Sequence, residues 1–180
     1  MSTRLYTVGH SSRSLDELVE LLREHQIALL IDVRRYPGSR RNPQFARAAL
    51  EQALPAAGID YRWVEALGGR RPRRRESPHT AWRVAGFAGY ADHMDTPAFQ
   101  EAAGELLASA RARRLAVMCA EARPEQCHRR LIADWATARG AEVIHIDGPG
   151  RARPHRLPEF ARVEGGRILY DAGQLPLEPG

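Results

Sequence analysis

The sequence contains no lysine, few cysteines and no long apolar run, and each absence excludes a class of protein. Two cysteines in 180 residues exclude a disulfide-rich secreted scaffold, and both are expected to be free thiols. No apolar run approaches the roughly 18 residues that a membrane span needs. The N-terminal residues 1–17 lack the apolar core of a signal peptide. We therefore expect a cytoplasmic protein that makes no contact with a membrane.

All 27 basic residues are arginine, and with 22 acidic residues the formal net charge is +5. Every cation is thus a planar guanidinium, whose geometry suits phosphate and carboxylate groups. This composition predicts an anionic partner, either a small molecule or a nucleic acid. The length fits one domain over residues 1–180.

Apolar runs and helix-capping signals alternate along the chain. The predicted strands are 4–8, 27–33, 61–64, 115–119 and 142–146. The predicted helices begin at the capping box of Ser14 and Glu17, at Asn42-Pro43, at Thr96-Pro97 and at Pro124. This order predicts an α/β fold, a three-layer Rossmann-like domain whose mostly parallel sheet has helices on both faces.

Two segments do not follow this alternation. Residues 67–91 are rich in Gly, Pro and Arg, which is typical of a long surface loop. The tail from about residue 148 contains Pro-rich turns and one candidate strand at 167–170. We expect the loop and the tail to be largely irregular.

Polar residues follow each predicted strand. Parallel sheets bind ligands beyond the carboxyl ends of their strands, so these residues are expected to surround one pocket. The predicted catalytic residues are His10, Asp32, Cys119, Glu121 and His128. The predicted ligand-binding residues are Ser11, Arg34, Arg35, Gly68, Gly69, Tyr90 and Arg129.

Cys119 ends an apolar strand and precedes a helix predicted from Pro124. The helix N-terminus would lower the pKa of a thiol at this place, although a buried, inert cysteine is the alternative. Cys127 shares helical spacing with Leu131 and Trp135, which favours the core. The spacing of the two cysteines fits no short zinc-binding motif, so we predict no metal and no cofactor.

Several of the other predicted site residues have more than one possible role. Glu121 or His128 is a candidate for proton transfer, and Arg34 and Arg129 are candidates for holding an anion. Asp32 is a candidate for a pKa-tuned or ion-paired carboxylate with Arg34 as its partner, and the capping of a neighbouring loop or helix is its alternative role.

An arginine run follows the third strand and predicts a nucleic-acid contact. It consists of Arg70, Arg71, Arg73, Arg74 and Arg75. The nearby Trp82, Phe87 and Tyr90 would either stack on bases or close the loop onto the domain.

The motifs TVGHSS, IDVRR, LGGRR, GFAGYADHM and MCAEARPEQCHRR, in this order over about residues 5–147, resemble the DUF488 family. The resemblance implies an α/β fold but no established activity, and some members carry a DNA-repair label. The arginine-rich insert at 73–78 departs from the family pattern. A looser likeness to rhodanese domains lies in the IDVR strand and the later strand–Cys–loop–helix unit. That likeness does not extend to phosphate-ester chemistry, because position 125 is Glu where cysteine phosphatases have Arg.

Together, these patterns predict a polar pocket that binds an anionic ligand, and they leave open whether it is catalytic. A non-catalytic, DNA-repair-associated nucleic-acid-binding module that uses residues 70–75 is the alternative. A polar cluster with a structural role in a sensing or interaction domain is the third interpretation.

Overall fold

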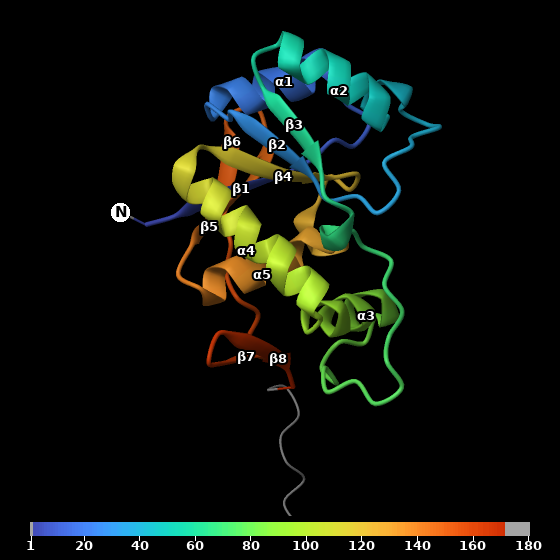
Figure 1. The fold of residues 1–180 in the computed structure, drawn as a ribbon, viewed down its shortest axis with the longest axis vertical. Helices are drawn as coiled ribbons and strands as arrows, with labels where there is room; N and C mark the ends of the chain where they lie inside the picture. The colour runs from blue at the N-terminus through green and yellow to red at the C-terminus, as the bar shows by residue number, and fades with distance from the viewer. Residues whose placement is uncertain (1, 172–180) are drawn as a thin grey trace, which may run out of the picture.

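The computed structural model describes residues 2–171, which form one six-stranded sheet and a separate hairpin (Figure 1). The strand order is β3-β2-β4-β1-β5-β6. Five strands are parallel, and β6 joins the edge antiparallel to β5. The strands are β1 (Arg4–Gly9), β2 (Leu29–Asp32), β3 (Asp60–Trp63), β4 (Leu115–Cys119), β5 (Glu142–Gly148) and β6 (Arg151–Pro154).

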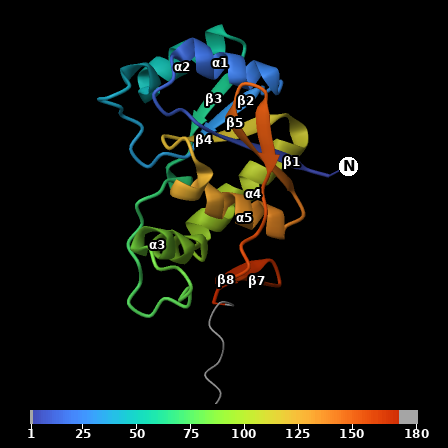
Figure 2. The same ribbon diagram turned by 180° about the vertical axis from the view of Figure 1, so that it is seen from behind.

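Helices cover both faces of the sheet, which confirms the predicted α/β architecture (Figures 1 and 2). The chain steps in one direction from β1 to β3 and returns through β4 to β5, so crossovers of one hand place the helices before and after this reversal on opposite faces. The helices are α1 (Leu15–Glu24), α2 (Arg47–Ala56), α3 (Ala85–Met94), α4 (Pro97–Ala112) and α5 (Arg129–Ala138). One apolar cluster lies under α1 and α2, and a second lies under α4 and α5.

The central strands and the best-capped helices agree closely with the sequence. Every residue of β4 is buried, as expected for a strand covered on both sides. The Ser14–Glu17 capping box forms at the start of α1, and the Thr96 side chain accepts a hydrogen bond from the Phe99 amide at the start of α4. No helix within residues 2–171 is long and apolar enough to cross a membrane.

Two predicted helix starts are wrong because each Pro opens only a short 3₁₀ turn. Pro43–Phe45 forms one such turn, and extended backbone at Ala46 separates it from α2. Pro124–Gln126 forms another, and Cys127 is extended, so α5 begins only at Arg129. Cys119 is therefore followed by a 3₁₀ turn and extended backbone, and the first turn of an α-helix comes only after them.

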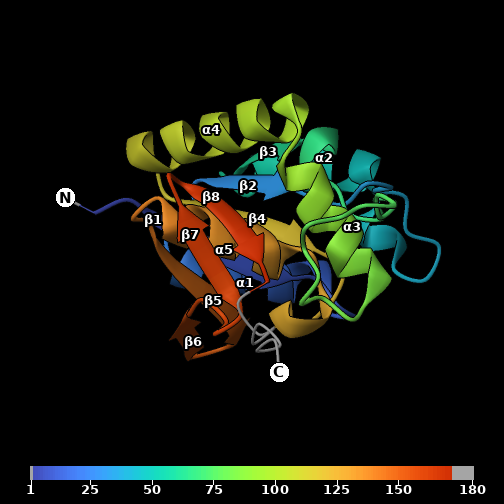
Figure 3. The same ribbon diagram turned by 90° about the horizontal axis from the view of Figure 1, so that it is seen from below.

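The predicted loop and tail also contain regular structure that the sequence did not reveal. Residues 85–91 of the expected 67–91 loop belong to α3, where a Cβ on Gly89 would lie 2.0 Å from the Arg71 carbonyl oxygen. In the tail, the predicted strand 167–170 is confirmed as β8 (Arg167–Tyr170), whereas β6 and β7 (Ala161–Glu164) were not predicted. β7 and β8 form a hairpin that lies beside α5 in Figure 3. Only the part from residue 172 lies outside the described residues.

Candidate functional site

A cavity of about 370 Å³ opens at the carboxyl ends of β2 and β4. Its walls come from the loop after β2, the loop around Gly69, the start of α3 and the segment after β4. Of the predicted catalytic and ligand-binding residues, those that line it are Arg34, Arg35, Gly69, Cys119, Glu121 and His128. The cavity is also lined by residues that the sequence did not single out: Tyr36, Val84, Gly86 and Gln126. Arg70 lines it as well, although the sequence had assigned this residue only to the arginine run.

The other predicted residues do not line this cavity: His10, Ser11, Asp32, Gly68, Tyr90 and Arg129. Strand alternation explains the most important separation. Asp32 pairs in register with Met118, whose side chain belongs to the apolar cluster under α1 and α2. Cys119 is the next residue and belongs to the cluster under α4 and α5. Asp32 and Cys119 therefore point to opposite faces of the sheet.

Asp32 belongs to a sealed ion-pair network. The carboxylate is completely buried and accepts hydrogen bonds from Arg34 Nε at 2.9 Å and Nη2 at 2.6 Å. The Tyr61 hydroxyl donates to the same carboxylate at 2.5 Å. Burial and the Asp32 charge raise the pKa of Tyr61, which keeps this hydroxyl a donor. These contacts support the ion-pair interpretation of Asp32.

Arg34 and His10 complete this network. Arg34 Nη2 also donates to the Phe45 carbonyl at 2.8 Å, and Arg34 Nη1 lies 3.4 Å from His10 Nε2. The His10 ring stacks on Phe45, and its Nδ1 donates to the Ser11 carbonyl at 2.8 Å. Burial and the Arg34 charge lower the pKa of His10, so the ring is neutral. Because these nitrogens are already engaged, Arg34 is not a free anion clamp.

Ser11 connects the loop after β1 to the segment after β4. Its backbone has a positive φ of 50°, and its amide donates to the Ala120 carbonyl at 3.0 Å. A Cβ on the neighbouring Gly9 would lie 1.7 Å from the Glu121 carbonyl oxygen. The loop after β1 therefore fixes the backbone that carries Glu121, whose own side chain is exposed.

The two cysteines form a thiol pair beside a buried guanidinium. Burial acts to raise the pKa of Cys119, but a hydrogen bond with Cys127 and the Arg129 charge outweigh it, and the net shift is downward. Burial and the proximity of Cys119 raise the pKa of Cys127 well above its ordinary value. Cys127 is core-facing, as the helical spacing predicted, and it also reaches the cavity. Cys119 Sγ also lies 3.6 Å from the Glu121 carbonyl oxygen, so of the two thiols Cys119 has the lower pKa and Cys127 the higher one.

His128 is a neutral ring wedged between two loops. Its Nε2 donates to the Val33 carbonyl at 2.7 Å, and a Cβ on Gly69 would lie 2.7 Å from its Nδ1. Burial lowers the pKa of His128 to about 4. The Tyr90 ring lies 5.0 Å from it, and the Tyr90 hydroxyl donates to the Leu67 carbonyl at 2.7 Å. Tyr90 is therefore buried packing behind the cavity.

Gly68 lies where the loop around residue 69 meets the loop after β2. A Cβ on this residue would lie 2.6 Å from Arg35 Cα, so only glycine lets the backbone approach this closely. The glycine pair places the loop around residue 69 against the loop after β2.

The arginine run divides into structural and free members. Arg71 donates to Glu65 and Gly68, and Arg74 lies 3.5 Å from both Asp92 and Asp95. The exposed members without a carboxylate partner among residues 2–171 are Arg70, Arg73 and Arg75. Trp82 is almost fully buried beneath the Arg130 guanidinium, so it closes the loop onto the domain.

A second polar cluster lies under α5 and was not anticipated as a unit. Thr7 Oγ1 donates to His145 Nδ1 at 2.6 Å, His145 Nε2 to His155 Nδ1 at 2.9 Å, and His155 Nε2 to Asp134 at 2.6 Å. The Tyr170 hydroxyl donates to the other Asp134 oxygen at 2.7 Å. His145 lies in β5, whereas the other four residues come from β1, the segment after β6, α5 and β8, and no local spacing links them.

The described residues contain no group of three or more His, Cys, Asp or Glu side chains arranged to hold a metal ion. No curated protein matches the chain, and no solved structure matches it. The family model described as "Domain of unknown function DUF488" matches residues 14–136, which is more than half of the chain. This match confirms the resemblance carried by the sequence motifs. The chain belongs to the DUF488 family.

Proposed function

We propose that the cavity binds a small anionic ligand and brings it against the Cys119 thiolate. Arg129 is the observation that carries this proposal. Its side chain is completely buried, and only Nη2 has a protein partner, the Ala122 carbonyl at 2.9 Å. Nε and Nη1 are buried without a partner among the described residues.

A buried cation requires a nearby negative charge, since an unpaired charge in a protein interior is strongly unfavourable. No carboxylate of residues 2–171 lies within ion-pair distance of Arg129. The Arg129 charge instead lowers the pKa of Cys119, and the Arg129 amide donates to Cys127 Sγ at 3.5 Å. A Cys119 thiolate would balance the charge of Arg129, although it would not bond to Nε or Nη1, and it would be a nucleophile in the cavity.

The rim of the cavity adds charge of the same sign. Arg35 and Arg70 line it, and Arg70 is exposed without a carboxylate partner among the described residues. Glu121 is the acidic residue in the lining, and it is exposed and unpaired within residues 2–171. This arrangement supports an anionic ligand held by Arg70 and Arg35, with Glu121 placed to exchange a proton with it.

Alkylation of Cys119 by iodoacetamide, followed by mass spectrometry over a range of pH, tests the thiolate. We expect Cys119 to react at neutral pH and Cys127 to remain unmodified. Arg129→Met keeps the length of the side chain without its charge, so the alkylation of Cys119 should shift to higher pH. Arg130→Met is the matched control, because the Arg130 guanidinium lies over Trp82 instead.

Inorganic phosphate and a nucleoside monophosphate then test the anion. Either ligand, if it enters the cavity, should slow alkylation of Cys119, and Arg70→Ala should remove the protection. A Cys119 that titrates like a free thiol in both the parent protein and Arg129→Met would contradict the proposal. Failure of every anion to protect Cys119 would contradict it as well.

A further inference from the structure

Tyr36 stands at the mouth of the cavity and is the most exposed large hydrophobic side chain of the described residues, at 62%. Its hydroxyl makes no hydrogen bond within residues 2–171. The guanidinium groups of Arg35 and Arg70 lie 5.5 and 5.8 Å from its ring centre. Folding does not account for an aromatic ring held in solvent between two arginines, because burial would be more favourable.

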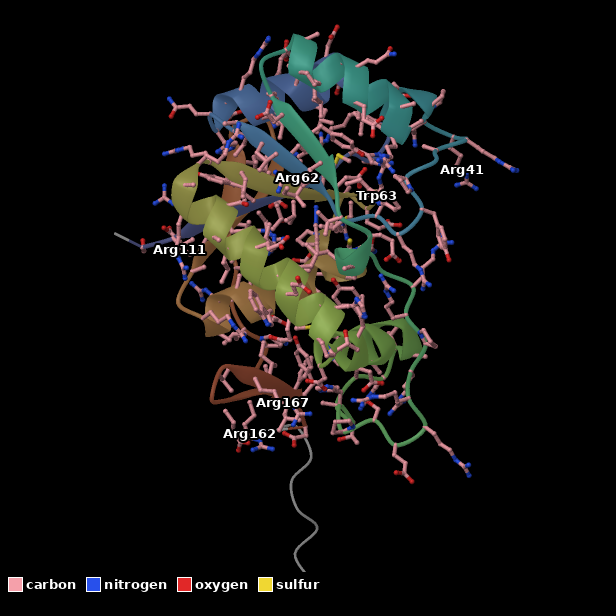
Figure 4. All side chains as sticks on the ribbon, viewed as in Figure 1. Arg41, Arg62, Trp63, Arg111, Arg162 and Arg167 are labelled. Carbon is pink, nitrogen blue, oxygen red and sulfur yellow. The ribbon has the colours of Figure 1, made fainter. Side chains whose placement is uncertain are left out.

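Two arginine-bearing loops flank this ring. The loop after β2 and the loop before α3 lie on the same side of the molecule (Figures 1 and 3). Figure 4 shows Arg41 extending outward from the first loop. The exposed arginines of the two loops that have no carboxylate partner among residues 2–171 are Arg40, Arg41, Arg70, Arg73, Arg75 and Arg83. Tyr36 thus lies between one arginine of each loop, Arg35 and Arg70, and both loops carry further exposed cations.

We propose that single-stranded nucleic acid binds this surface, with one base stacked on Tyr36 and the flanking phosphates on the two arginine loops. The proposal rests on the proposed function and names its ligand class, since the nucleotide next to Tyr36 would reach the cavity. Exposed aromatic rings interleaved with cations bind single strands, because every unpaired base presents a face for stacking. A duplex hides those faces, and a cavity of about 370 Å³ is too small to admit one.

Three free arginines of the loop before α3 explain why the ligand would be a polyanion rather than an isolated phosphate. Arg70 belongs to the cavity, whereas Arg73 and Arg75 lie further along the same loop, beyond its lining. A single phosphate in the cavity would use Arg70 with Arg35 and would leave Arg73 and Arg75 without a ligand. A chain of phosphates would use all three.

Fluorescence anisotropy with a labelled oligothymidylate of about ten nucleotides tests the proposal. Tyr36→Ala should weaken binding by about tenfold, the effect of losing one stacked base, whereas Tyr36→Phe should retain it. The triple variant Arg70→Ala/Arg73→Ala/Arg75→Ala should weaken binding strongly and flatten its salt dependence. The matched control is Arg62→Ala/Arg111→Ala/Arg151→Ala, whose exposed arginines lie elsewhere; Arg62 and Arg111 are labelled in Figure 4. This control should lose little affinity.

The outcomes separate this proposal from the cavity's proposed function. Tyr36→Ala binding as tightly as the parent protein, or a duplex of the same sequence binding as tightly as the single strand, overturns the stacking proposal. Protection of Cys119 by phosphate without any oligonucleotide binding also overturns it, while the anion pocket stands. Tyr36-dependent oligonucleotide binding without protection of Cys119 by any anion supports this surface and overturns the pocket's function.

Discussion

His145 makes the protein sensitive to acid in a way that can be worked out from its contacts. The ring is 2% exposed and both nitrogens are engaged, with Thr7 donating to Nδ1 and Nε2 donating to His155. Burial, together with the proximity of His155 and the charges of Arg129 and Arg153, lowers the pKa of His145 from 6.5 to about 3. The folded protein therefore holds this ring neutral well below the pH at which the unfolded chain protonates it.

The sign of the effect follows from which state binds the proton. Between pH 6.5 and about 3 the unfolded chain carries a proton on His145 and the folded protein does not, so acid favours unfolding. At pH 5 the difference is 6.5 − 5 = 1.5 pH units, or about 2 kcal/mol at 1.36 kcal/mol per unit. His128, with a pKa of about 4, destabilises the folded protein in acid for the same reason. The two histidines together lower the free energy of unfolding by up to about 4 kcal/mol at pH 5. A typical domain has only about 5–15 kcal/mol in total.

Urea unfolding followed by circular dichroism between pH 7.5 and 5 measures this loss. Carboxylates remain largely ionised in that window, so the histidines dominate the slope. His145→Gln should lower stability at pH 7.5, since it breaks the chain of hydrogen bonds, but it should also make stability less dependent on pH. His128→Gln should flatten the remaining dependence. A parent protein whose stability is unchanged from pH 7.5 to 5, or a His145→Gln variant with the parent slope, would refute the reasoning.

Two further substitutions test the packing around the site. Gly89→Ala places a Cβ 2.0 Å from the Arg71 carbonyl oxygen and should cost about 1–3 kcal/mol in thermal unfolding. Gly86→Ala in the same helix meets nothing within 4 Å and should gain up to about 1 kcal/mol, so equal effects would contradict the proposed contact. Asp32→Asn weakens the pairing of buried Arg34 and should cost about 3–5 kcal/mol in urea unfolding; a neutral result would show that the network is dispensable.

The predictable part of the fold is the part in which local sequence and tertiary burial agree. β4 is apolar at nearly every position, and Ser14 with Glu17 forms a complete capping box, so neither element depends on distant residues for its identification. β6 is the opposite case. All four of its residues are exposed, and only pairing with β5 makes them a strand. No hydrophobic period could have revealed it.

α3 was missed for a different physical reason. Its glycines are typical of a loop, since each costs about 1 kcal/mol relative to alanine in a helix interior. At Gly89 that cost is outweighed by close packing, because the backbone of the arginine run passes directly over the missing side chain. The glycine is thus a consequence of a contact between segments eighteen positions apart, which local propensity does not encode.

For the site, the rule that ligands bind at strand carboxyl ends correctly brought Arg35, Cys119 and His128 to one cavity. It could not separate them from Asp32, because an error of one residue in a strand exchanges its two faces. Arg129 shows that sequence position also does not reveal how deeply a side chain is buried. Its sequence position suggested an anion clamp, but only its complete burial and its two unpartnered nitrogens show why a negative charge is needed there.

The separation of Asp32 from the cavity gives its network a positioning role rather than a chemical one. Asp32 accepts a hydrogen bond from the Arg34 amide, and Trp63 Nε1 donates to the Arg34 carbonyl at 2.7 Å, so the backbone of Arg34 is held on both sides. Arg35 and Tyr36 follow immediately and form the rim. An exposed ring can stack on a ligand without a large entropic cost only if its backbone is already fixed. The buried ion pair on one face of the sheet therefore fixes the backbone beside the proposed binding surface at its edge.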